Sequence, residues 1–350
     1  MTRSFQLRTL ATLAAALAAA LLCSRLGVPL PWMIGPLLAT AAASMLGAPT
    51  QSWDPLRNAG QWLIGTALGL YFTPQVTALV ARLWWAIALG IAWALALGWL
   101  FGRWLHRDLA RRLPESEPVR RATSYFAGAV GGASEMTLLA EREGARTDLV
   151  AAAHSLRLLV VTVAIPFAFS FSGVHGLDPG AAARRFDPGG LALLAGATGT
   201  GALLMSRTRW ANPWFMGALL VAMAFAMTGL ELSALPAWAT NAAQLVIGVS
   251  LGVRFRAEFV HTAPRWLASV ALGSGVMIVL SAGFALLLAR LTGLHPATLV
   301  LGTAPGGIAE MAITAKVLQM GVPVVTAFQV CRLVAVLVLV GPLYRLTRGS

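Results

Sequence analysis

The stretch GGASEM at residues 131–136 recurs as GGIAEM at residues 306–311, and both copies lie in otherwise apolar sequence. Each glutamate is followed by an arginine at the same spacing: Arg157 follows Glu135, and Arg332 follows Glu310. The two blocks therefore align without a gap. Ionisable side chains are costly in apolar surroundings, and a duplicated acid and arginine point to a role in function.

The composition is that of a membrane protein. Hydrophobic residues make up 58% of the chain and charged residues only 11%, whereas soluble proteins are about half apolar and a quarter charged. The segments 83–105 and 266–289 each contain an uncharged run of about 20 residues, enough to cross a bilayer. The sequence predicts an all-α polytopic membrane protein.

The basic residues do not form a nucleic-acid surface, although the net charge is +13. They punctuate the apolar runs, as expected of loops that flank membrane helices. We therefore expect the lipid bilayer and a small molecule or ion as partners, with no direct contact to nucleic acid.

Residues that could perform redox or hydrolytic chemistry are scattered. The five histidines form no H-x-H or E-x-x-H pattern, and there is no Walker A sequence. We expect no metal, no cofactor and no enzymatic activity.

The duplication extends beyond the GG–Glu blocks. WMIGPLL at 32–38 matches WFMGALL at 214–220, and NAGQWLIGTALG at 58–69 matches NAAQLVIGVSLG at 241–252. These matches predict two membrane repeats, residues 1–172 and 191–350, joined by a linker at 173–190. Asn58 and Asn241 are expected to cap the helices that they begin. Gln61 and Gln244 follow them and would line a polar path or, the favoured alternative, form hydrogen bonds between helices.

The orientation of the two repeats follows from the loop charges. Helices expected at 8–24, 31–48, 58–78 and 83–102 precede the basic loop 103–121, which belongs in the cytoplasm. An inverted second repeat places more arginines inside than a parallel one. We therefore favour inversion, with about ten transmembrane helices in a bacterial inner membrane and both termini in the cytoplasm.

Inversion requires that residues 122–172 cross the membrane once. A re-entrant hairpin over 122–141, turning at Gly131-Gly132, followed by a helix from residue 148, would satisfy this. The second repeat would have the same elements at 296–315 and 323–345. Glycine pairs permit unusual dihedrals and close approach of a ligand, and broken segments at mid-membrane are common in secondary transporters. The alternative is a pair of small-residue helices that pack closely.

The polar residues of these segments form the candidate site. Glu135 and Glu310 suit a proton carrier or Na⁺ ligand, or they cap the returning helix. Arg157 and Arg332 could bind a substrate carboxylate, or each could pair with a glutamate. His154 could relay protons, but Gln329 at the matching place favours a shared hydrogen-bonding role. The predicted substrate and ion site comprises Gly131, Gly132, Glu135, Arg157, Gly306, Gly307, Glu310 and Arg332, supported by His154, Gln329, Gln61 and Gln244.

The paired G-G-x-x-E-M blocks and the W-x-x-G-x-L-L openings resemble the AbrB membrane-duplication family over about residues 10 to 345. That family carries labels that refer to an ammonia monooxygenase and to a regulator of gene expression, and it is similar to transporter folds built from inverted repeats. The halves differ at Ala218 opposite Pro36, Val130 opposite Pro305, and His154 opposite Gln329, which puts symmetric chemistry in question there.

The resemblance and the site together favour a secondary transporter of a small anionic metabolite, coupled to H⁺ or Na⁺, with a homodimer as a further expectation. The alternative is a membrane regulator or sensor that acts indirectly on gene expression. Monooxygenase activity is disfavoured, because the sequence lacks a cluster of metal ligands.

Overall fold

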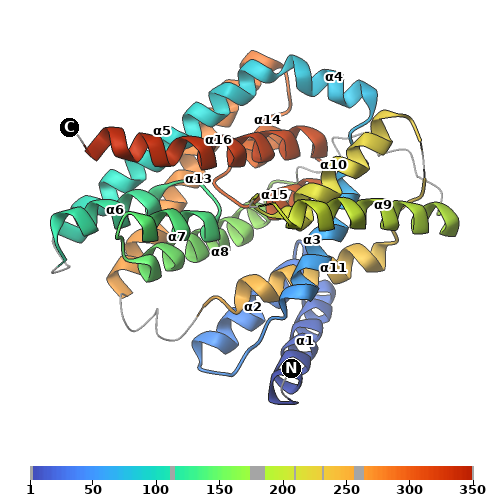
Figure 1. The fold of residues 1–350 in the computed structure, drawn as a ribbon, viewed down its shortest axis with the longest axis horizontal. Coiled ribbons are helices and arrows are strands. Elements are labelled where there is room, and N and C mark those ends of the chain that lie inside the picture. Colours follow the sequence, from blue (N-terminus) through green and yellow to red (C-terminus); the bar gives the residue numbers. More distant parts are fainter. Residues whose placement is uncertain are drawn as a thin grey trace. The chain divides into compact units, whose positions relative to one another are not determined.

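The computed structural model describes residues 3–110, 115–173, 186–208, 210–230, 232–255 and 264–348, and within them all regular structure is helical (Figure 1). Most of the predicted linker 173–190 lies outside these residues.

Six of the described helices are long and apolar enough to cross a membrane. These are α1 (Arg3–Arg25), α5 (Trp84–Ala110), α8 (Thr147–Ser172), α9 (Pro188–Ser206), α13 (Pro264–Thr292) and α16 (Val322–Arg348). The bent pair α3 (Asp54–Gly69) and α4 (Pro74–Arg82) would make a seventh span in the described part of the chain. The all-helical, membrane-type class is thus confirmed, while the number of ten spans stays a prediction.

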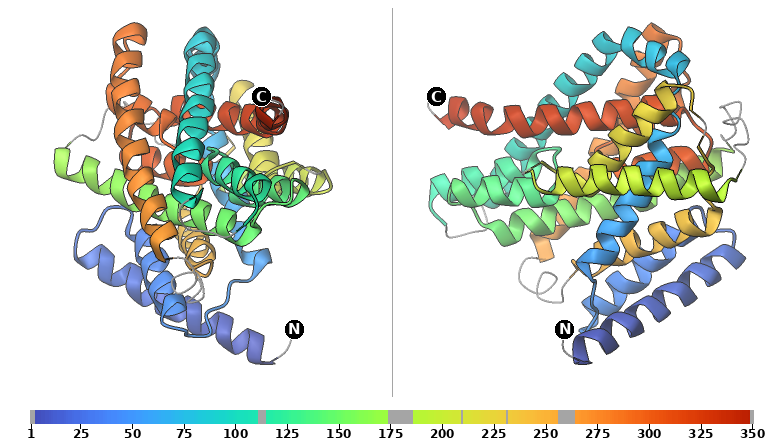
Figure 2. Two further views of the ribbon diagram at one scale, coloured as in Figure 1. Left: turned by 90° about the vertical axis from the view of Figure 1, so that its left-hand side faces the viewer. Right: turned by 45° about the vertical axis from the view of Figure 1, so that its right-hand side comes forward.

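One compact unit consists of Met1–Arg82, Pro166–Ala257 and Ala312–Pro323. Within it, α3 packs against α10 (Pro213–Met227), and α11 (Ala237–Gly252) packs against α2 (Pro31–Met45). In addition, α1 packs on α2 and α9 on α10 (Figure 2). Each predicted repeat therefore contributes one α-helix to each of the pairs α3–α10 and α11–α2.

The duplicated W-x-x-G blocks begin with the same local conformation. Leu30 and Asn212 both adopt a left-handed backbone, with φ of 49° and 47°, and each is followed by the proline that starts the next helix. A left-handed backbone is uncommon for leucine, though less so for asparagine, and the same conformation at the two matched positions is a shared feature of this turn.

Glycines bring the paired helices of this unit into backbone contact. A Cβ on Gly248 would lie 2.6 Å from the carbonyl oxygen of Met33, and one on Gly65 would overlap the carbonyl of Phe215. One turn further along, Gly252 faces Leu37 and Gly69 faces Leu219 in the same way. The matched glycines thus make matched contacts across α3–α10 and α11–α2.

The helix predicted at 58–78 was wrong in both its start and its continuity. Helix α3 begins at Asp54 and α11 at Ala237, with Trp53 and Pro236 as their N-caps, so Asn58 and Asn241 lie inside helices. The chain then bends by 89° between α3 and α4. Pro74 explains the break, because proline cannot donate a helical hydrogen bond and disfavours helix in the residue before it.

The second compact unit consists of Leu83–Ile165, Glu258–Met311 and Val324–Ser350. Helix α5 packs on α6 (Glu117–Gly128) and on α13, and α13 packs on α14 (Pro296–Thr303). Trp93 of α5 stacks on Phe284 of α13 with ring centroids 4.8 Å apart. This unit also contains α7 (Ala133–Arg142) and the first residues of α15 (Ile308–Val317), and it therefore holds both GG–Glu blocks.

Candidate functional site

Both GG–Glu blocks are breaks between two short helices. Helix α6 ends at Gly128 and α7 begins at Ala133, while α14 ends at Thr303 and α15 begins at Ile308. The first residue after each break has the same extended conformation: Ala129 has ψ of 137° and Ala304 has ψ of 142°. Helix α6 contacts α7, so the segment predicted as a hairpin consists of two contacting helices joined at the glycines.

The difference between Val130 and Pro305 does not change the backbone. A residue before proline is pushed towards extended conformations, which accounts for Ala304. Ala129 adopts the same conformation before Val130, so other contacts must hold this break open. Those contacts come from α8 and α16.

His154 of α8 binds the open end of α6. Its Nε2 lies 2.8 Å from the carbonyl oxygen of Phe126, and its Nδ1 lies 2.8 Å from Nη2 of Arg157. The carbonyl can only accept a hydrogen bond and the guanidinium can only donate one. These two partners are both satisfied by the tautomer that carries its proton on Nε2, and they engage both ring nitrogens of His154.

Gln329 of α16 has the matching place at the end of α14. Its Nε2 donates to the carbonyl oxygens of Leu301 at 2.7 Å and Gly302 at 3.2 Å. Carbonyls in the last turn of a helix lack partners within that helix, and a buried one needs a hydrogen bond from elsewhere. His154 and Gln329 supply it to carbonyls at matched positions.

The two arginines also bind the breaks. Arg332 donates through Nη1 to the carbonyl of Ala304 and through Nη2 to that of Gly306, the latter at 2.6 Å. Arg157 Nη2 lies 3.5 Å from the carbonyl oxygen of Gly131, at the long limit for a hydrogen bond. Non-helical backbone at membrane depth requires partners of this kind.

Neither arginine forms an ion pair with any carboxylate in the part of the chain that the structure describes. Both are buried, Arg157 to 2% exposure and Arg332 to 6%. Arg157 keeps two buried donors, Nε and Nη1, without a partner, and Arg332 keeps Nε. The sequence suggested a substrate carboxylate or a glutamate as the partner of each arginine, and no ion pair with a glutamate is observed in the described residues.

The glutamates lie against the glycines that precede them. Gly132 and Gly307 accept the first hydrogen bonds of α7 and α15, so Glu135 and Glu310 occupy the third helical position. A Cβ on either glycine would overlap the glutamate carboxylate. A glutamate that folds back from this position towards the start of its helix has the geometry of a capping box. Glu310 is 7% exposed and Glu135 is half-buried.

The two breaks are neighbours within this unit. A Cβ on Gly306 would lie 3.0 Å from Val161, which is one turn beyond Arg157 on α8. The structure thus brings both Gly-Gly segments, both arginines, His154 and Gln329 together in a single unit.

Gln61 and Gln244 lie in the other compact unit. Gln61 donates to Asn212 Oδ1 at 3.4 Å, which joins α3 to α10, and Gln244 is buried in α11. For Gln61 the geometry is that of a hydrogen bond between helices.

The sequence did not predict the hydrogen-bond partners of these polar side chains, because the partners are backbone carbonyls. A carbonyl becomes available only where a helix ends, and the sequence indicated the Gly-Gly turn without indicating which carbonyls it would leave open. Thr162 of α8 was missed as well. It is fully buried, its hydroxyl has no partner, and nothing distinguishes it in sequence from a packing residue.

Comparison with known proteins places this site in a family. The family described as "Transition state regulatory protein AbrB" matches residues 32–348. The chain is 26% identical to "Uncharacterized protein YhjN" of Bacillus subtilis (strain 168), over 97% of this chain and 93% of that one. It is 27% identical to "Putative regulator AbrB" of Escherichia coli (strain K12), over 90% and 89% of the two chains. The family match covers both GG–Glu blocks and both arginines, and the chain therefore belongs to the AbrB family.

Proposed function

We propose that this protein is a secondary transporter of a small anionic metabolite, coupled to H⁺ or Na⁺. The observation that carries the proposal is the pair of unpartnered donors on Arg157. Buried polar groups are nearly always hydrogen-bonded, and hydrogen bonds from a guanidinium to a carboxylate are among the strong ones. An anion at this position would supply those acceptors.

The charge of the site supports an anionic substrate. Arg157 and Arg332 are both buried and form no ion pair in the described residues. Buried charges are otherwise paired. An anion bound beside the guanidiniums would balance their buried positive charge.

The coupling ion is assigned to Glu135 and Glu310. Their position at the start of α7 and α15 keeps each carboxylate beside the Gly-Gly segment that also contacts an arginine. Binding of H⁺ or Na⁺ at the carboxylate and of an anion at the guanidinium would then involve the same short stretch of backbone. No step in this scheme is an enzymatic reaction.

The architecture proposed for this transporter is two inverted repeats with about ten spans, in the bacterial inner membrane with both termini cytoplasmic. The matched contacts α3–α10 and α11–α2, and the matched hydrogen bonds at the two breaks, support two repeats of one design. Broken segments of this kind accompany inverted repeats in secondary transporters. A homodimer remains part of the proposal.

Transport is tested with the full chain reconstituted in proteoliposomes under an imposed pH or Na⁺ gradient. Uptake of a panel of labelled mono- and dicarboxylates is measured. We expect saturable uptake of at least one anion, lost in Arg157→Gln and strongly reduced in Arg157→Lys, because one ammonium cannot contact both His154 and a carboxylate in the guanidinium's geometry. Arg290→Gln, at the end of α13, is the matched control. Gradient-independent flux, or none for any anion, would overturn the proposal.

A second candidate, a membrane regulator that acts indirectly on gene expression, is favoured by the name of the Escherichia coli relative. A transcriptional reporter in a deletion strain distinguishes the two. A regulator that works without transport would still restore reporter output in the Arg157→Gln variant. If transport sets the level of an inducer, the variant loses both activities.

A further inference from the structure

The second compact unit has a two-part pocket whose apolar part adjoins the first break at Ala129 and Val130. Its apolar part has a volume of about 400 Å³ and its polar part about 340 Å³. Trp99, Tyr125 and Thr347 line both parts, so the two adjoin one another between α5, α6 and α16. We propose that this pocket binds an anionic phospholipid, with the phosphate in the polar part and an acyl chain in the apolar part.

The polar part is strongly basic. Arg103 and Arg107 come from the end of α5 and Arg121 from the first turns of α6, and His106 lies among them. None of the three arginines forms an ion pair within the described ranges of the chain. Basic pockets between membrane helices on the cytoplasmic side are suited to lipid phosphates.

Glu117, which contacts the lining residue His106, is engaged with other groups. Glu117 binds Arg120 at 2.7 Å and His106 Nε2 at 3.0 Å. The hydrogen bond from Arg120 holds the pKa of Glu117 below its usual value, so the carboxylate stays ionised and bound there. His106 Nδ1 is buried and has no partner. The lining therefore offers cationic groups to a phosphate.

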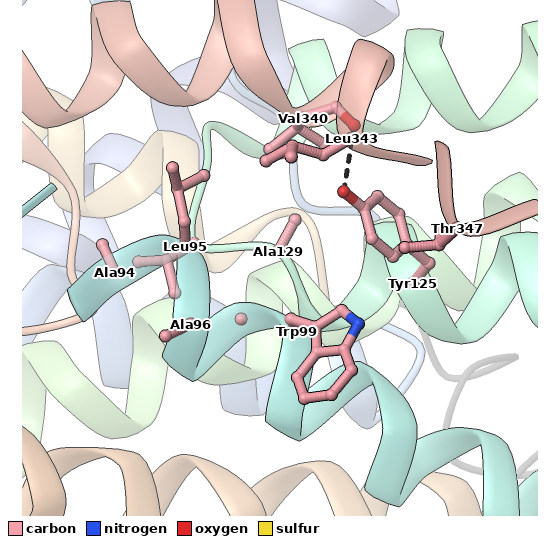
Figure 3. Close-up of a pocket in the computed structure, with 11 residues that line it drawn as sticks. Ala94, Leu95, Ala96, Trp99, Tyr125, Ala129, Val340, Leu343 and Thr347 are labelled. Carbon is pink, nitrogen blue, oxygen red and sulfur yellow. Dashed lines mark hydrogen bonds between the residues drawn. The ribbon is translucent and has the colours of Figure 1, made fainter. Parts of the chain in front are cut away.

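The apolar part begins directly beyond the aromatic residues. Leu95, Ala129, Val340 and Leu343 line it, and Tyr125 donates to the carbonyl oxygen of Val340 at 3.0 Å (Figure 3). This bond fixes the phenol ring where the two parts adjoin.

The tryptophan beside the arginines completes a membrane-interface arrangement. The guanidinium of Arg103 lies 5.0 Å from the centre of the Trp99 ring, and Trp99 is 41% exposed. Tryptophan concentrates at the level of lipid headgroups. A free phosphate would use only the polar part and a neutral hydrocarbon only the apolar part, whereas a phospholipid with a net negative charge matches both.

The test uses delipidated full-length protein in detergent, with bound lipid counted by native mass spectrometry and stability followed by thermal unfolding. The probes are phosphatidylglycerol, phosphatidylcholine and inorganic phosphate. We expect phosphatidylglycerol to stay bound and raise Tm more than phosphatidylcholine, and inorganic phosphate to have little effect. Arg103→Gln/Arg107→Gln/Arg121→Gln should weaken phosphatidylglycerol binding at least tenfold.

A second variant tests the apolar part and guards against a triple variant that fails to fold. Ala96 is exposed and lines the pocket, and Ala96→Phe should fill it and weaken phosphatidylglycerol binding. Ala92→Phe, one turn earlier on the exposed face of α5, should not. Equal binding of the two lipids would overturn the proposal. It would also be overturned if inorganic phosphate stabilised the protein as much as phosphatidylglycerol and its binding were unaffected by Ala96→Phe. Neither outcome depends on transport activity.

Discussion

His154 and Gln329 are different side chains at matched positions, and they satisfy the same need. Each places a nitrogen donor on a carbonyl at the end of a short helix, and each carries an acceptor on its other side. In the first repeat that acceptor receives Arg157. This arrangement therefore requires a donor and an acceptor on one side chain, which a histidine and a glutamine both supply.

His154→Gln should therefore preserve folding and transport, because Gln329 already performs this task in the second repeat. His154→Ala should destabilise the protein by roughly 1–3 kcal/mol, the cost of leaving a buried carbonyl unsatisfied. Thermal unfolding in detergent and proteoliposome uptake measure the two effects. Loss of the pH dependence of uptake in a well-folded His154→Gln variant would instead establish a proton-relay role.

Two variants distinguish the role of the glutamate's charge from the role of its position. Glu310→Gln retains a side chain suited to a capping box and should fold normally, but uptake should lose its dependence on the ion gradient and fall at least tenfold. Gly307→Ala keeps the carboxylate but displaces it, because the new Cβ would overlap it. It should also slow uptake. Wild-type transport in Glu310→Gln would leave the carboxylate with a capping role alone.

At this scale the sequence identified the side chains of the candidate site better than their partners. The matched spacing of Glu135 with Glu310 and of Arg157 with Arg332 singled out residues that the structure brings into one unit. The sequence allowed each arginine to pair with a glutamate, because buried charges are usually paired. The observed partners are the carbonyls of Gly131, Ala304 and Gly306, which a list of side chains does not contain.

The elements of the other unit are held together by close approach of backbones. Gly248 and Gly252 of α11 face carbonyls of α2, as Gly65 and Gly69 of α3 face carbonyls of α10. In a membrane, where burial of apolar surface between helices is not a driving force, packing through small residues is a main source of association.

Gly248→Ala should lower stability by roughly 1–3 kcal/mol, as overpacking does in other cores, because its Cβ would meet the backbone of Met33. Gly196→Ala in α9 is the matched control, since nothing lies within 4 Å of its Cβ position. It should be neutral or stabilising, as alanine is the better helix former. The midpoint of thermal unfolding measures both. Equal midpoints for both variants would contradict the role assigned to these contacts.

Helix types were predictable from apolar runs, whereas boundaries were not. The run 58–78 is apolar enough to suggest one span, yet Thr73-Pro74 divides it and α4 buries none of its residues. Asn58 and Asn241 were chosen as caps for their side chains, but Asp54 and Ala237 begin these helices earlier. The spacing of apolar residues predicts which face of a helix is buried, but it does not predict the residue at which the helix begins.

For the whole molecule, cysteine labelling of the loops tests directly whether the two repeats are inverted. In a Cys23→Ser/Cys331→Ala background, Arg107→Cys and Arg265→Cys should both resist a membrane-impermeant maleimide in intact cells and react after permeabilisation. Arg290→Cys should react in intact cells. Reaction of Arg265→Cys from outside, with protection of Arg290→Cys, would establish parallel repeats.

The contacts of Gly65 also have a consequence for biosynthesis. Its partner on α10, Phe215, is 150 residues further along the chain. At a translation rate of about 5–20 residues per second, α3 exists for roughly 8–30 seconds before α10 has been made. During that interval its glycine face must be covered by lipid or by the insertion machinery. Slowing synthesis between the two halves should therefore expose α3 to degradation even though every residue of the finished protein is unchanged.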